Sequence, residues 1–224
     1  MKLKINGFEN EIIFDANNIN VLVIEDSKLF VNIIDMINDK IKKIDNDEVF
    51  LVDENNNEMD MDKKAFILLD LFNIEYNTKK ILDKIYDIIS ENISKNQDYE
   101  MEKITLRLRD YLINEINELP FEFIIKDEIK VNDILKLYSL KIDSENYITI
   151  LEKVELVIEM LSILKVADLL IIPNLKLYLS DEELVELYKY SMYNNIKLLV
   201  IERNQCEKLD YEEVLVIDKF FNEN

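Results

Sequence analysis

The chain has 224 residues, of which 49% are hydrophobic and 33% are charged, and its formal net charge is −20. This composition predicts a globular, soluble protein that is long enough to bury a core, and it excludes a disordered chain. The chain has one glycine, Gly7, so a phosphate-binding loop such as GxxxxGK cannot be written, which excludes a conventional nucleotide-binding enzyme.

Other absences narrow the chemistry and the compartment. The chain contains no histidine, which removes the commonest general base and transition-metal ligand and leaves oxygen-ligand metal binding and hydroxyl or lysine chemistry. The single cysteine, Cys206, excludes an internal disulfide and fits a reducing cytoplasm. We expect no membrane span and no signal peptide, because apolar runs stay short. The net charge argues against nucleic acid, although it does not fix the sign of the field in one groove.

The first 72 residues combine short apolar runs with one helical pattern. The predicted strands are residues 2–5, 11–14, 21–26 and 48–52. The apolar run at residues 66–70 predicts a further buried strand. Alternatively, this run opens a helix. Apolar residues between Ser27 and Ile44 have helical spacing, and the polar stretch 53–64 predicts a turn or exposed loop.

The central part of the chain changes to helical patterns. The predicted helices are residues 78–93, 103–116, 131–138 and 147–166. The first two have narrow apolar stripes of the kind expected at a contact between subunits. Residues 147–166 are apolar over a broad face, which indicates a helix of the core or, as an alternative, a partner interface.

Strand patterns return after residue 168. Residues 169–173, 197–202 and 214–217 are predicted strands, and Ser180 with Glu183 has the capping-box spacing that opens a helix to about Tyr193. Buried runs separated by helices indicate a largely parallel sheet. The predicted fold is therefore an α/β head domain with a mostly parallel sheet, built from residues 1–72 and 168–224. An all-helical domain, residues 73–167, is inserted in it.

The segment from Asn117 to Asp133 is the best candidate for a functional site. A helical pattern ends there, a short apolar strand-like run follows at residues 123–125, and another helix begins. The segment contains five carboxylates, from Glu118, Glu122, Asp127, Glu128 and Asp133. Calcium takes six to eight oxygen ligands, which these residues could supply if the chain folds back at Pro120 and again near Asp127. The alternative is that the acids are solvated or cap helix N-termini.

Four lysines lie in or just after this segment, namely Lys126, Lys130, Lys136 and Lys141. They are candidates for phosphate contacts with DNA, which would be independent of sequence and sensitive to salt. Alternatively, they are ordinary solvated lysines whose stems cover apolar surface.

Four motifs in register resemble a known family. They are VLVIED at residues 21–26, Asp127-Glu128-Ile129, LLIIPN at 169–174 followed by YLSDE at 178–182, and LLVIER at 198–203. Together they resemble the type II-A CRISPR-associated adaptation protein, the Csn-two family. The resemblance places Asp127, Glu128 and Asp133 on the acidic motif of the family. The chain departs from it at residues 123–125, where members are more continuously acidic, and at 53–62, where relatives carry lysines.

The resemblance implies more than the residues alone indicate. It implies a nucleotide-kinase-like head without a working phosphate loop, a helical leg domain, and a homotetrameric ring with a basic hole. Such a ring binds the ends of double-stranded DNA, requires calcium, and has no catalytic activity. It supports spacer acquisition beside the CRISPR integrase complex and the RNA-guided effector nuclease. The alternative is an acidic protein-interaction scaffold of the adaptation complex, for which DNA binding is secondary.

Overall fold

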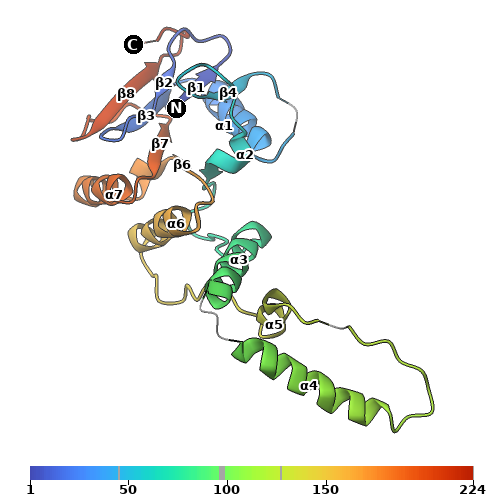
Figure 1. Ribbon diagram of the computed structural model, residues 1–224. Helices are drawn as coiled ribbons and strands as arrows, with labels where there is room; N and C mark the ends of the chain where they lie inside the picture. The colour runs from blue at the N-terminus through green and yellow to red at the C-terminus, as the bar shows by residue number, and fades with distance from the viewer. Residues whose placement is uncertain (45, 96–98, 127, 224) are drawn as a thin grey trace. The chain divides into compact units, whose positions relative to one another are not determined.

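The computed structural model describes residues 1–44, 46–95, 99–126 and 128–223 (Figure 1). These residues form two compact units, one of Met1–Glu75 with Ser144–Asn224 and the other of Tyr76–Asp143. The second unit is shorter than the segment 73–167 expected from the sequence, because residues 144–167 group with the first unit.

The first unit is built on a parallel sheet of five strands. Their order is β5-β6-β7-β3-β8, and every neighbouring pair is parallel. The strands are β3 (Ile19–Ile24), β5 (Ala65–Ile67), β6 (Leu169–Pro173), β7 (Lys197–Glu202) and β8 (Glu212–Ile217). The prediction of a mostly parallel sheet within an α/β fold is confirmed, and residues 65–67 are a strand rather than the start of a helix.

A second, antiparallel sheet has the order β2-β1-β4. Its strands are β1 (Lys2–Ile5), β2 (Ile12–Ile13) and β4 (Val49–Val52). β1 and β2 form the hairpin-like start that the sequence predicts. Gly7 lies between them with φ of 88°, a conformation that costs glycine least.

The two faces of the parallel sheet are covered by different elements. Side chains alternate between the faces along each strand. On one face, α1 (Ser27–Ile41) and the small sheet share a core with residues such as Leu22, Ile171 and Ile201. The intervening strand residues, for example Val200, face the other way, where α7 (Asp181–Tyr193) contacts β7 and α6 (Ile150–Leu164) contacts α7 (Figure 1).

The helix α6 is largely buried, on the side of the sheet where α7 lies. Its fully or nearly fully buried residues are Val154, Leu156, Val157, Ile158, Met160 and Leu161. A capping box between Thr149 and Glu152 begins the helix, and Lys165 in the left-handed conformation ends it. The capping box of Ser180 and Glu183, which the sequence predicts, is present at the start of α7.

One short helix departs from the sequence expectation. The predicted loop 53–64 ends in α2 (Met61–Lys64). Met61 is 2% exposed and lies in the core, which explains why these four residues coil against the sheet. A helix of one turn carries too few apolar positions to show periodicity.

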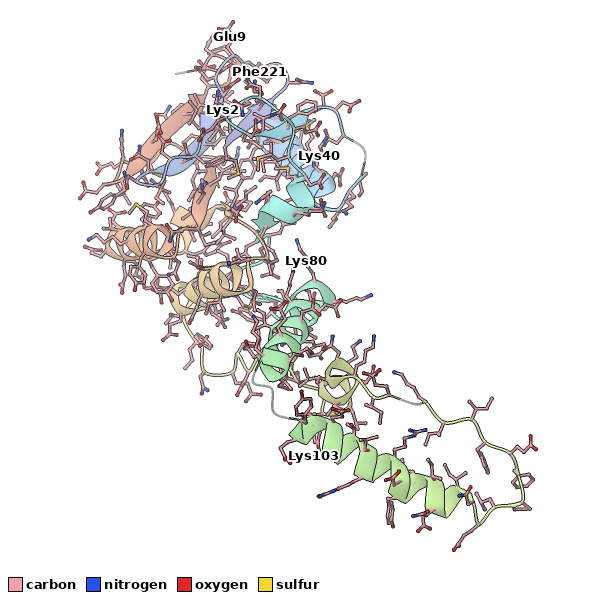
Figure 2. All side chains as sticks on the ribbon, viewed as in Figure 1. Lys2, Glu9, Lys40, Lys80, Lys103 and Phe221 are labelled. Atoms are coloured by element: carbon pink, nitrogen blue, oxygen red, sulfur yellow. The ribbon has the colours of Figure 1, made fainter. Side chains whose placement is uncertain are left out.

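The second unit is helical. It contains α3 (Lys79–Lys95), α4 (Glu100–Ile116) and α5 (Val131–Leu137), with α5 in contact with α3. The side chain of Asn77 joins the two ends of the unit, because its Nδ2 donates to the Ile142 carbonyl at 3.0 Å and its Oδ1 accepts from the Ile142 N–H at 2.7 Å. No described residue of α4 is buried, and side chains project from it on several sides (Figure 2).

The C-terminus is tied to the first hairpin. Both carboxylate oxygens of Glu223 accept backbone hydrogen bonds, from the N–H of Glu9 at 2.6 Å and of Asn10 at 2.7 Å. Glu9 and Phe221 accordingly lie near each other at one end of the first unit (Figure 2). Across the described ranges, every helix is too short or too polar to cross a membrane.

Candidate functional site

The candidate segment connects α4 to α5. In the described residues between 121 and 130 there is no helix or strand, so the strand-like run predicted at 123–125 is wrong. The physical reason is that no neighbouring strand pairs with it, and Ile124 is fully exposed. Phe121 and Phe123 make an edge-to-face contact at 6.3 Å between ring centroids.

The candidate metal ligands are not gathered into one cluster. Glu118, Glu122 and Glu128 are exposed, and Asp127 lies outside the described residues. Asp133 is engaged elsewhere, because its Oδ2 pairs with the Lys126 ammonium at 2.7 Å and accepts from the Lys130 N–H at 3.3 Å. Within the described ranges, no three acidic or cysteine side chains are grouped closely enough to hold a metal ion.

Three of the candidate lysines instead act on Asp133, Lys126 through its ammonium, Lys130 through its backbone N–H and Lys136 through its charge. The hydrogen bond from Lys126 is the main reason that the pKa of Asp133 is lowered, followed by the Lys130 N–H, and the charge of Lys136 contributes. Lys141 follows α5 in the chain. All four lysine side chains are exposed, so they are accessible to a polyanion.

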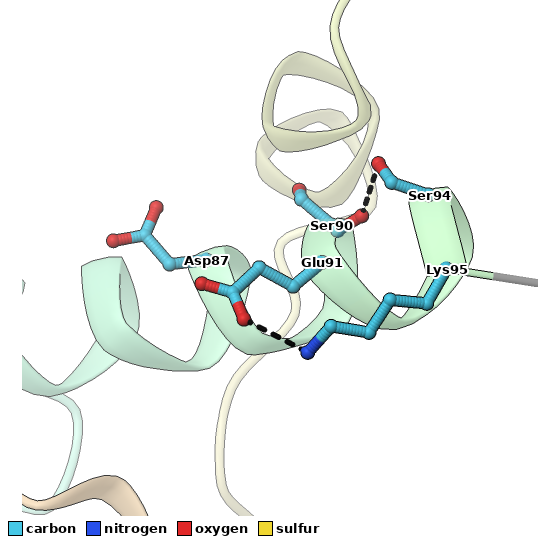
Figure 3. A pocket seen from close by; sticks show the side chains of 5 residues that line it. All are labelled: Asp87, Ser90, Glu91, Ser94 and Lys95. Atoms are coloured by element: carbon cyan, nitrogen blue, oxygen red, sulfur yellow. Dashed lines mark hydrogen bonds and ion pairs between the residues drawn. The ribbon is translucent and has the colours of Figure 1, made fainter.

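A shallow depression of about 480 Å³ lies on α3, beside α5 (Figure 3). It is lined by Asp87, Ser90, Glu91, Ser94 and Lys95. Asn132 of α5 accepts from the Ser90 hydroxyl at 2.5 Å and donates to Asp87 at 3.5 Å. These bonds fix the start of α5, and hence Asp133, against α3. No local pattern connects Asn132 with Ser90, since 42 residues separate them.

Charge divides unevenly between the two units, which the total of −20 conceals. Residues 76–143 contain 11 lysines and arginines and 14 acidic residues, whereas the rest of the chain contains 16 and 33. The second unit therefore carries further cations that the motif-based prediction missed, among them Lys84, Lys103 and Arg107. Counting charge by domain would have found them.

The carboxyl end of β3 is occupied by the protein's own acids. Asp26 caps α1, and its Oδ1 accepts from the N–H groups of Lys28 and Leu29 at 3.0 and 2.8 Å. Glu25, beside it, accepts from the Gln205 side chain at 3.0 Å. In nucleotide-binding proteins the N–H groups at such a helix start bind phosphate. Here a carboxylate takes that place, which repels a phosphate.

Comparisons with known proteins agree with this fold. A family model described as CRISPR-associated protein (Cas_Csn2) matches residues 42–221. The crystal structure of Stu0660 of Streptococcus thermophilus is similar over 97% of this chain and 75% of that chain, with a TM-score of 0.64 and 13% identity, which supports the fold alone. A structure described as a putative ABC transporter (ATP-binding protein) from Pyrococcus furiosus covers 96% of this chain and 97% of its own. Its TM-score is 0.39 and its identity to this chain is 11%.

Proposed function

Because the chain belongs to the CRISPR-associated protein (Cas_Csn2) family of CRISPR adaptation proteins, we propose that it binds the ends of double-stranded DNA during spacer acquisition. Binding is sequence-independent, and the binding form is a homotetrameric ring. The role is binding rather than catalysis, and the partners are the CRISPR integrase complex and the RNA-guided effector nuclease.

The observation that carries the proposal is the group of exposed lysines around Asp133. Lys126 pairs with this carboxylate, Lys130 donates its backbone N–H to it and the charge of Lys136 acts on it, in a unit where cations nearly balance acids. Phosphate contacts of this kind position a protein on DNA without reading its sequence. Repetition of the group in each subunit of a ring would concentrate positive charge where DNA passes. The acidic first unit would then repel DNA and confine it to that place.

The helix α4 supports assembly of several copies. Ile104, Leu108, Tyr111 and Leu112 are 55, 49, 64 and 40% exposed, although their spacing forms an apolar stripe. An isolated helix of this length is marginally stable in water, and its stability comes from burying such a face. A second copy of the chain supplies an apolar surface that covers it, as the proposed ring requires.

Calcium is proposed as the cofactor, held by carboxylates of the segment 118–133. Glu118, Glu122 and Glu128 are exposed, and the described residues from 118 to 130 contain no helix or strand, so that an ion could draw these glutamates together with Asp127 and Asp133. Oxygen donors of this type are those that calcium prefers. When bound, calcium would supply positive charge that offsets the acids beside the candidate lysines.

The DNA proposal is tested by replacing Lys126, Lys130, Lys136 and Lys141 together with glutamine. We expect the affinity for linear duplex to fall roughly tenfold or more. The slope of log K against log salt should shrink by about 0.9 for each phosphate that the variant no longer neutralises. Electrophoretic mobility shifts over a salt series measure both quantities.

The matched control replaces four exposed lysines of the first unit, Lys28, Lys42, Lys208 and Lys219, with glutamine, which changes the charge equally. This control should bind like the wild type. Equal losses of affinity in the two variants would reject the assigned surface. Equal binding of the wild type to linear and covalently closed duplex would reject recognition of ends.

The calcium proposal is tested with Asp127→Asn combined with Glu128→Gln. We expect calcium at a hundredfold excess over Kd to raise the free energy of unfolding of the wild type by about 2.7 kcal/mol, and the double variant to lose this gain. Thermal unfolding with calcium and with chelator measures it, and light scattering gives the oligomeric state. Asp110→Asn with Glu115→Gln is the control of equal charge. An unchanged calcium response in the double variant would contradict the ligand assignment.

A second candidate function is that of an acidic scaffold that binds other adaptation proteins. The excess of 33 acidic over 16 basic residues outside 76–143 favours it. Under this alternative the wild type would bind the integrase complex or the effector nuclease while showing no salt-dependent binding to DNA.

A further inference from the structure

The connection between β7 and β8 crosses the sheet without a helix. β3 lies between the two strands and is parallel to both, so residues 203–211, here named the crossover segment, run from the end of β7 back to the start of β8. Such crossovers usually contain a helix that satisfies its own backbone. All of 203–211 is described, and none of it is helical. Its backbone is therefore not paired within a helix, and residues 203–208 are exposed.

A buried lysine contacts the crossover segment at one backbone carbonyl. Lys176 lies in the short 3-10 helix η1 (Leu175–Leu177), which follows β6. Its ammonium is 2.7 and 2.8 Å from the two carboxylate oxygens of Glu212, and 3.4 Å from the Glu207 carbonyl of the crossover segment. The side chains of Lys176 and Glu212 are 6 and 0% exposed. An ion pair so well shielded from water is sensitive to any change of charge beside it.

The carboxylate of Glu212 is well supplied with donors. Besides Lys176, it accepts from the Tyr188 hydroxyl of α7 at 2.7 Å and from the Leu209 N–H of the crossover segment at 2.9 Å. Glu212 is thus the direct partner of the Lys176 ammonium and anchors the far end of the crossover segment.

Glu202, the last residue of β7, is less well compensated. It is 5% exposed, and its Oε1 accepts from the backbone N–H of Lys176 at 2.8 Å, not from the ammonium. The site therefore holds two buried carboxylates and one ammonium. Burial raises the pKa of Glu202 to about 7, and the Glu212 charge adds to the rise, whereas the N–H and the charge of Lys176 oppose it.

The other groups facing Glu202 do not neutralise it. Tyr188 and Asp181 come from α7, and Cys206 comes from the crossover segment. Burial and the hydrogen bond to Glu212 raise the pKa of Tyr188, and burial and the charge of Glu202 raise that of Cys206, so both stay neutral at neutral pH. Arg203, the next residue in the chain, is exposed.

We propose that the crossover segment is a proton-sensitive strap, which protonation of Glu202 closes and ionisation of Glu202 loosens. Ionisation places a second negative charge beside the Lys176–Glu212 pair, and that charge is relieved when residues 203–211 lift and admit water. The inference goes beyond the proposed function, because it concerns the first unit and requires neither DNA nor calcium.

The sign of the effect follows from linkage. The closed form binds the proton more tightly than the open form, where Glu202 has an ordinary pKa near 4.5. Closure is therefore most favoured at low pH. The free-energy preference for the closed form over the open form falls as the pH rises from about 4.5 to about 7. This direction is opposite to that of a salt-bridged carboxylate. Between pH 6 and pH 8 the closing equilibrium should weaken about tenfold.

Hydrogen–deuterium exchange of the purified protein tests the proposal. After correction for the intrinsic exchange rate, the protection of the Leu209 amide should fall about tenfold between pH 6 and pH 8 in the wild type. In Glu202→Gln, which is neutral and of similar size, protection should change less than twofold. Glu207→Gln, an exposed acid on the same segment, serves as the control and should behave like the wild type.

A second measurement needs no variant. In protein labelled with ¹³C, the side-chain carboxyl of Glu202 should titrate near neutral pH. Titration near the ordinary glutamate value would overturn the proposal, and so would the same pH dependence of exchange in the wild type and in Glu202→Gln.

Discussion

Replacing Lys176 with methionine is expected to lower the free energy of unfolding by about 3–5 kcal/mol at pH 8, because it leaves buried carboxylates without their cation. Methionine keeps most of the apolar stem, so the variant removes the charge rather than the packing volume. The side chain of Glu212 is fully buried and Glu202 is 5% exposed, so water does not replace the lost cation. Urea unfolding followed by circular dichroism measures the change.

Two comparisons make this result specific. Lys208→Met removes an exposed lysine of the crossover segment and should change stability by less than about 0.5 kcal/mol. At pH 5 the loss in Lys176→Met should be smaller than at pH 8, since Glu202 is then protonated in the folded protein. A loss that is no larger than that of Lys208→Met would show that the ion pair is not shielded as described.

Truncation of Leu161 to alanine is expected to cost about 2–5 kcal/mol, because it removes a fully buried side chain of α6 and leaves a cavity. Ile163→Ala on the same helix is the control, since Ile163 is 62% exposed. Ile163→Ala should lower the free energy of unfolding only by the small amount that is usual for an exposed position. Chemical denaturation of both variants measures the difference.

The same variant tests where the inserted unit ends. The structure groups α6 with the parallel sheet, so Leu161→Ala should lower protection from hydrogen exchange in β6 and β7 and leave α3 unchanged. If α3 were the element to lose protection, the boundary near residue 167 expected from the sequence would describe the protein better.

The parallel sheet could be predicted because its strands are short, continuous apolar runs bounded by polar or capping residues. The motif at 198–203 is a clear case, since Leu198, Leu199, Val200 and Ile201 are all fully buried. Capping at Ser180 depends on nearest neighbours in the chain and is equally predictable. The family resemblance, which rests on these motifs in register, is confirmed by the family model.

Features that depend on distant contacts could not be predicted from the pattern. The strand-like run at Phe123–Ile125 has the apolar residues of a strand but no partner, and pairing is a property of the whole fold. The pairing of Lys126 with Asp133 depends on how an irregular segment turns. The calcium ligands and the DNA contacts remain predictions, since they depend on ions, DNA or other subunits.

The position of β3 in the sheet affects the order in which the protein can fold during synthesis. β3 is complete at Ile24, yet both of its neighbours, β7 and β8, come from the last 28 residues of the chain. At about 5–20 residues per second, the ribosome needs roughly ten to forty seconds to make the intervening segment. Throughout that time a strand of six apolar or amide side chains has no sheet partner, whereas residues 76–143 form a continuous unit that can fold as it emerges. Among the strands of the parallel sheet, β3 therefore spends longest exposed to mispairing and to chaperones.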